Sequence, residues 1–240
     1  MHNPGKEMPN FLDEHDGEIE TLAQTFITFP NVTKGKIFTW LRQFEEEHKP
    51  VALKLLKEVI FYDSAKILGC CIDLYSQARR QLGEEISKSW ILALGNAGKS
   101  GDEMLHKFRQ ANNLHTRNFD HLFKYKSEIA SLGDSFSGNL IFIDDFIGSG
   151  RQATTSLLDI TAVVPKAKIT LLVLAGYEDA VRTVVNETGC TILPVNLFSE
   201  SSKLFSDRNT LFNSEEKGIL KNYCQRTGSK IPYGYHDTST

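Results

Sequence analysis

Two adjacent aspartates followed by a glycine-rich turn are the residues of this sequence best suited to chemistry. They lie in "LIFIDDFIGSGRQATTS", Leu140–Ser156, where Asp144 and Asp145 follow an apolar run and "GSG" comes soon after. Two glycines let backbone N–H groups turn toward one compact anion, at the N-terminus of the helix expected to follow. Carboxylates repel a phosphate but suit vicinal hydroxyl groups or a Mg²⁺ shell near it. The segment therefore predicts a ligand with a phosphate and a nearby diol, as in a ribose 5-phosphate.

An earlier loop also has the form of a phosphate-binding motif. Ala93–Ser100, "ALGNAGKS", fits A/G-x₄-G-K-S/T, the loose form of the nucleotide-binding P-loop. Ser100 and Glu103 have capping-box spacing, which predicts a helix N-terminus at the loop. One hypothesis is therefore a P-loop nucleoside triphosphatase that uses Ala93–Ser100 and Asp144. It is the weaker one, because alanine replaces the first glycine and such an enzyme needs no second glycine-rich loop directly after its acidic strand.

The chain between the two loops is basic. Leu105–Lys126 carries one aspartate, Asp120, and five cationic residues, which are Lys107, Arg109, Arg117, Lys124 and Lys126. Such charge can stabilise a departing polyphosphate, although the same pattern is typical of a solvated helix face. Arg109 is the candidate clamp for a pyrophosphate, since it follows the capped loop by one to two helical turns. The cysteines and histidines show no metal-ligand spacing, so no metal ligand is assigned to the protein itself.

Composition limits the classes of protein that the chain can belong to. It has 240 residues, 40% of them hydrophobic, and a net charge of −3. This length can bury a core, and the charge argues against a protein that mainly coats nucleic acid or anionic membrane. No apolar run approaches the roughly 20 residues that cross a bilayer, and the N-terminus has no signal-peptide pattern. We expect a cytoplasmic protein without a membrane partner.

The elements that position these residues fall into two halves. Residues 1–88 have helical periodicity, with Thr33 as an expected N-cap, Pro50 in a first turn and Gly83 near a C-terminus. They predict a helical N-terminal subdomain. Residues 89–240 predict a second domain, in which four apolar runs have the composition of strands buried on both faces. These runs are Trp90–Leu94, Leu140–Asp144, Ile169–Ala175 and Thr191–Leu197.

Helical patterns at Arg151–Val163 and Glu178–Glu187 separate the last three strands. Alternation of strand and helix predicts an α/β fold, a Rossmann-like parallel sheet with helices on both faces. Ligands of such sheets bind at the carboxyl ends of the strands, and both loops fall there.

The segment "IFIDDFIGSGRQA" resembles the signature of type I phosphoribosyltransferases, in which an apolar strand, two acids and a small-residue loop precede a helix. The resemblance implies a sheet of the phosphoribosyltransferase type and phosphoribosyl pyrophosphate as ligand. It implies that Asp144 and Asp145 contact the ribose diol at the reacting end. The residues implied to hold the 5-phosphate, here called the phosphate loop, are Gly148, Ser149, Gly150, Arg151 and Gln152.

The family also has an earlier loop that holds the pyrophosphate together with Mg²⁺. The segment at that place, here called the pyrophosphate loop, is Gly98, Lys99, Ser100 and Gly101. One ligand with a phosphoryl group at each end would explain both loops. The chain departs from the family at Arg151 and Gln152, where threonines are usual. Asn118–Gly133 is predicted as a helix where the family tends to have a flexible hairpin, and Phe198–Phe212 is the candidate base-binding hood.

The wider motif set is similar to phosphoribosyltransferase-like proteins of bacterial conflict systems, including effectors encoded beside antiphage reverse transcriptases (retrons). It comprises "WLRQF" at Trp40–Phe44, "GKSG" at Gly98–Gly101 and "FIDDFIGSG" at Phe142–Gly150. This likeness implies a toxin-like enzyme held inactive by a regulatory protein or by a complex of reverse transcriptase and noncoding RNA. Two functions stay open besides the triphosphatase. One is an enzyme acting at the anomeric carbon of phosphoribosyl pyrophosphate or a nucleotide, and the other is a non-catalytic sensor of the same ligand.

Overall fold

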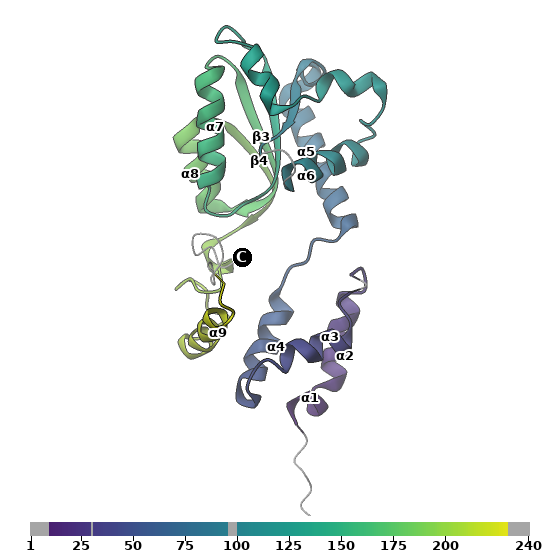
Figure 1. Cartoon of the computed structure of the whole chain (residues 1–240), viewed down its shortest axis with the longest axis vertical. Helices are drawn as coiled ribbons and strands as arrows, with labels where there is room; N and C mark the ends of the chain where they lie inside the picture. The colour runs from purple at the N-terminus through teal and green to yellow at the C-terminus, as the bar shows by residue number, and fades with distance from the viewer. Residues whose placement is uncertain (1–9, 30, 96–99, 230–240) are drawn as a thin grey trace, which may run out of the picture. The chain divides into compact units, whose positions relative to one another are not determined.

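The computed structural model describes residues 10–29, 31–95 and 100–229, with the backbone alone at Ser100. These residues form two compact units, coloured along the chain in Figure 1. A helical unit combines residues 10–63 with residues 212–229, and a sheet unit spans Ser64–Leu211. The domain boundary predicted from the sequence, between residues 88 and 89, lies within the sheet unit.

The helical unit brings the C-terminal helix onto the N-terminal helices. Its elements are α1 (Phe11–Glu14), α2 (Asp16–Thr25), α3 (Lys34–Leu41), η1 (Glu46–His48), α4 (Lys49–Glu58) and α9 (Ser214–Arg226). As predicted, Thr33 caps α3 by accepting from the backbone N–H of Lys36, and Pro50 lies in the first turn of α4. Lys54 Nζ lies 2.8 Å from Glu216 Oε1, and this ion pair joins α4 to α9.

The sheet unit is built on four parallel strands in the order β1-β2-β3-β4. Its strands are β1 (Trp90–Ala93), β2 (Asn139–Ile147), β3 (Lys168–Tyr177) and β4 (Thr191–Phe198). Its helices are α5 (Ser64–Leu82), η2 (Gly83–Lys88), α6 (Ser100–Ala111), η3 (Arg117–Leu122), η4 (Lys126–Ser131), α7 (Arg151–Val163), α8 (Glu178–Thr188) and η5 (Glu200–Ser202). The predicted α/β fold and its four strands are confirmed.

Helices cover both faces of this sheet (Figure 1). The helices α5 and α6 pack on one face, and α7 and α8 cover the other. Successive residues of β2 face opposite ways, so Phe142 packs with Leu157 of α7 and Val184 of α8 while Ile143 is buried on the other side. Because α5 contacts β3, β4 and α6, residues 64–88 belong with the sheet.

The segment between α6 and β2 differs from its prediction. Asn118–Gly133 was expected to be a helix, but it forms the two 3₁₀ turns η3 and η4 joined by extended backbone. Phe123 makes a parallel bridge with Ile91 of β1, and the N–H of Lys124 donates to Ile91 O at 3.2 Å. The backbone of this segment thus pairs with the edge strand β1 through the carbonyl group of Ile91. This tertiary hydrogen bond outweighs the weak helical propensity of residues 118–133.

Candidate functional site

The two glycine-containing loops leave the same edge of the sheet from adjacent strands. Ala93, the last residue of β1, pairs with Ile143 of β2, and the N–H of Leu94 donates to Ile143 O at 3.0 Å. The first loop therefore begins beside Asp144. A Cβ atom added at Gly101 would lie 3.3 Å from Gly95 N, so the described ends of this loop meet.

Part of the predicted pyrophosphate loop cannot be placed. Gly98 and Lys99 lie outside the described residues, and Ser100 is described only as the backbone start of α6. Gly101 lies in the first turn of that helix.

The two aspartates of β2 lie in different environments. Asp144 is 7% exposed and pairs in register with Val173 of β3, whereas Asp145 is half-buried. The carboxylate of each accepts the backbone N–H of the next residue, at 3.0 Å for Asp144 and 2.9 Å for Asp145. The carboxyl group of Asp144 nevertheless interacts with that of Asp145, whose residue is the more exposed of the two. Asp145 is therefore the carboxylate more open to a ligand.

Burial changes the acidity of this pair. Burial first, and the negative charge of Asp145 second, together raise the pKa of Asp144 to about 7. A carboxyl group that takes up a proton near neutral pH can donate a hydrogen bond as well as accept one. The pair can therefore present a carboxylate and a carboxylic acid to neighbouring hydroxyl groups.

The phosphate loop has the geometry of an anion site. Gly148 and Ser149 are half-buried, and Gly150 is buried with a φ of 81° as the N-cap of α7, with no side-chain capping bond. The first turn of a helix leaves backbone N–H groups without intrahelical partners and favours negative charge. Arg151 and Gln152 are exposed in that turn. Within the described chain, Thr154 of the next turn has a buried Oγ1 without a hydrogen-bond partner.

Close packing on α8 and β3 holds the loop in place. A Cβ at Gly150 would lie 2.9 Å from Val184 Cγ2 and 3.1 Å from Ala180 O. A Cβ at Gly176, at the end of β3, would lie 3.1 Å from Ile147 Cβ. Glycine is thus required at Gly150 both for its left-handed backbone and for this approach.

Arg109 lies beside the first loop, but its guanidinium has partners. Its Nη2 lies 2.9 Å from Asp120 Oδ1, and its Cζ is 4.3 Å from the centre of the Phe123 ring. The side chain lines a cavity of about 470 Å³ that reaches Gly95. Its role as a pyrophosphate clamp stays a prediction.

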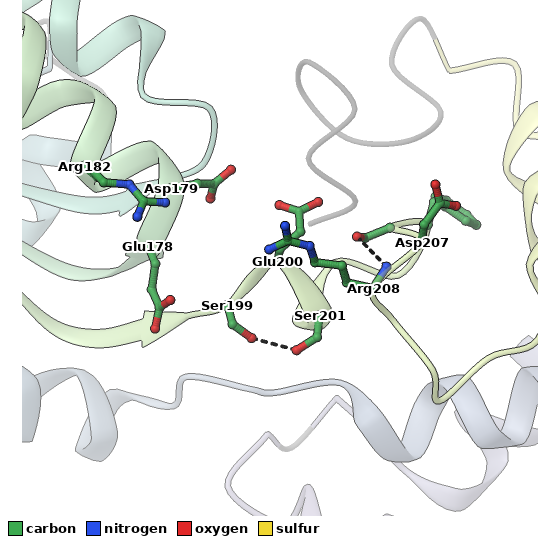
Figure 2. A pocket seen from close by; sticks show the side chains of 10 residues that line it. Glu178, Asp179, Arg182, Ser199, Glu200, Ser201, Asp207 and Arg208 are labelled. Atoms are coloured by element: carbon green, nitrogen blue, oxygen red, sulfur yellow. Dashed lines mark hydrogen bonds between the residues drawn. The ribbon is translucent and has the colours of Figure 1, made fainter.

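A second cavity, of about 790 Å³, lies at the carboxyl ends of β3 and β4. Figure 2 shows that carboxylates and guanidinium groups surround it. The labelled charged residues are Glu178, Asp179, Arg182, Glu200, Asp207 and Arg208. Of the expected hood, Phe205 lines this cavity, whereas Phe212 is buried in the helical unit.

Sequence reasoning missed Lys203, which forms ion pairs with two carboxylates that line this cavity, Asp179 and Glu200. Its Nζ lies 2.9 Å from Asp179 Oδ2 and 2.7 Å from Glu200 Oε2, and 4.8 Å from the centre of the Tyr177 ring. Burial opposes its charge, yet the hydrogen bonds to Glu200 and Asp179 raise its pKa. The sequence feature that could have indicated this cavity is that polar residues directly follow the two apolar strands β3 and β4.

Within the described parts of the chain, no group of three or more His, Cys, Asp or Glu residues is arranged to hold a metal ion. Among those same parts, no helix combines the length and apolar character needed to cross a membrane.

This parallel sheet, with two aspartates and a glycine anion loop at one edge, defines a phosphoribosyltransferase-like α/β protein. The chain belongs to the PRTase-CE family, whose family model matches residues 37–240. Among solved structures, it is similar to orotate phosphoribosyltransferase from Aeropyrum pernix, at 15% identity and a TM-score of 0.37. That alignment covers 57% of this chain and 78% of the other. No curated protein matches the chain significantly.

We expect Asp144→Asn to change how stability depends on pH. The pKa of Asp144 is raised from 3.8 to about 7 on folding, so between these values the folded state binds the extra proton. The wild type should therefore lose roughly 2–4 kcal/mol relative to the variant as pH rises from about 4 to 7, and nothing further above that. Urea unfolding across this range measures the difference, and a pH-independent difference would contradict it. Asp145→Asn should move the transition to lower pH.

We expect Gly150→Ala to destabilise the sheet unit more than Gly189→Ala does. Both glycines have positive φ, which costs alanine about 1–2 kcal/mol, but only Gly150 has atoms within 4 Å of an added Cβ. Overpacking against Val184 and Ala180 should add about 1–3 kcal/mol. Equal free energies of unfolding for the two variants, measured with urea, would show that the loop does not pack tightly on α8.

Proposed function

We propose that the chain is a cytoplasmic phosphoribosyltransferase-like enzyme. It binds phosphoribosyl pyrophosphate, or a nucleotide with a ribose 5-phosphate, together with Mg²⁺ and acts at the anomeric carbon. One observation carries the proposal. Two loops leave one edge of the sheet from adjacent strands, and the aspartates lie at the strand end between them. A ligand with a phosphoryl group at each end and a diol in the middle fits this order.

The proposed roles follow from the environments of the residues. Asp145 accepts hydrogen bonds from the ribose diol, and Asp144 supplies a carboxyl group that is protonated near neutral pH. The phosphate loop, Gly148–Gln152, receives the 5-phosphate at the N-terminus of α7. Positive charge develops on the ribose as the bond at the anomeric carbon breaks, and the negative charge of the Asp145 carboxylate stabilises it.

The pyrophosphate end is assigned to Gly98, Lys99, Ser100 and Gly101, with Arg109 nearby as a clamp. In this proposal the phosphates of the ligand would carry the Mg²⁺, which would neutralise part of their charge. The bond from the anomeric carbon to the pyrophosphate oxygen breaks, and its electron pair leaves with the pyrophosphate. The acceptor bonds to the same carbon and loses a proton. We assign the acceptor to the cavity at the ends of β3 and β4.

One observation favours a second candidate function, a non-catalytic sensor of the same ligand. The segment between α6 and β2 is held on β1 by the bridge of Phe123 and the hydrogen bond from Lys124. A held segment is poorly suited to closing over a ligand and excluding water, which an enzyme of this type needs. A sensor would instead pass ligand binding to a partner through the helical unit.

Turnover separates the two candidates. The intact protein is incubated with labelled phosphoribosyl pyrophosphate or nucleotides, Mg²⁺ and a panel of acceptors, and released pyrophosphate or base is measured. We expect turnover that Asp145→Asn lowers about 100-fold, since it removes a transition-state charge contact, whereas Asp134→Asn at an exposed position leaves it unchanged. Binding without turnover across the panel would establish the sensor. ATP hydrolysis lost in Lys99→Ala but kept in Asp145→Asn would establish the triphosphatase instead.

The sequence likeness to bacterial conflict systems supports an extension of the proposal. In it, the enzyme is a toxin-like effector of antiphage defence, held inactive by a regulatory protein or by a reverse transcriptase with its noncoding RNA. Induced expression without a partner should then reduce bacterial viability, and Asp145→Asn should restore it. Colony counts after induction measure this, with Asp134→Asn as control. Toxicity that persists in Asp145→Asn at equal expression would refute an effector acting through this site.

A further inference from the structure

The cavity beside the start of the first loop has the size of a small-molecule site. Its volume is about 470 Å³, within the range of about 300–1,000 Å³ typical of ligand pockets. Its walls come from the end of β1, from one side of α6 and from the extended backbone that joins η3 to η4. Asp144, Asp145 and the phosphate loop do not line it.

The charged groups of this cavity favour an anion. Three cations line it, Arg109, Lys124 and Lys126, against one carboxylate, Asp102. Lys126 Nζ lies 3.4 Å from Leu94 O, and Lys124 Nζ lies 5.6 Å from the centre of the Trp90 ring. In the described chain, neither lysine forms an ion pair. Their positive charge is therefore not compensated locally, and a phosphate group would compensate it.

An aromatic ring stands at the same cavity. Tyr125 is 78% exposed, although its backbone is held by the hydrogen bond from its own N–H to Glu128 Oε1 at 2.8 Å. The neighbouring Phe123 ring is already covered by the Arg109 guanidinium. Tyr125 is thus the ring that a ligand can stack on, and its fixed backbone limits the entropy lost when it does.

We propose that this cavity binds a mononucleotide, with its phosphate at Lys124 and Lys126 and its base stacked on Tyr125. Stacking on an aromatic side chain beside cationic groups is how proteins bind nucleotides without selecting a base. A pyrophosphate or orthophosphate ion would use the cations but neither the ring nor most of the volume. The site is additional to the ribose phosphate site proposed on β2, and its existence does not require that function.

Calorimetric titration of the intact protein with 5′-AMP, GMP, CMP and UMP tests the proposal. We expect all four to bind, and adenosine and orthophosphate to bind at least about tenfold more weakly, because each offers only half of the contacts. Tyr125→Ala and Lys126→Met should each weaken nucleotide binding about tenfold, whereas Tyr125→Phe keeps the ring and should retain it. Lys88→Gln, an exposed lysine that does not line the cavity, is the matched control. Thermal unfolding confirms that each variant is folded.

Three results would overturn the proposal. The first is that none of the nucleotides binds at millimolar concentration. The second is nucleotide binding that ribose 5-phosphate displaces and that Tyr125→Ala leaves unchanged, which would place the nucleotide at the phosphate loop. The third is pyrophosphate binding as tightly as the nucleotides, with sensitivity to Lys126→Met but not to Tyr125→Ala. That result would make the cavity an anion subsite of the phosphoribosyl donor.

Discussion

Parallel hydrogen bonding of β2 to β1 on one side and to β3 on the other is the constraint on which the site depends. It brings the end of β1 beside Ile143, so that the first loop begins next to Asp144. It also places Gly176 of β3 against Ile147, directly before the phosphate loop. Because the carboxyl ends of parallel strands share one edge, residues distant in sequence meet there.

The same sheet gives its two adjacent aspartates different properties. Asp144 is buried and its pKa is raised, whereas Asp145 is half-buried, so neighbours in sequence differ in their access to a ligand. Burying a carboxyl group beside another carboxylate costs stability, and perturbed acidity of this kind is commoner at functional sites than elsewhere. The close packing of Gly150 on α8 instead adds stability, since it fixes the loop that would receive a phosphate.

Three features then follow one another along the carboxyl edge of the sheet. A cationic cavity with an exposed tyrosine lies at β1, the aspartates and the phosphate loop lie at β2, and a cavity of mixed charge lies at β3 and β4. This order leaves room for a ligand on each side of the proposed ribose site. The PRTase-CE family model spans the residues of all three features.

Much of the fold follows from the sequence alone, because its signals are local. The bounds of α7, the capping of α3 by Thr33 and the four strands depend on neighbouring residues and on hydrophobic periodicity. The aspartate and glycine motif likewise lies in one short segment. Tertiary structure decided the rest. The turns of residues 117–131 depend on a bond to β1, and α5 belongs to the sheet unit through its packing. The unequal burial of Asp144 and Asp145 and the pairing of Lys203 arise from strands and helices far apart in sequence, whose approach no local pattern encodes.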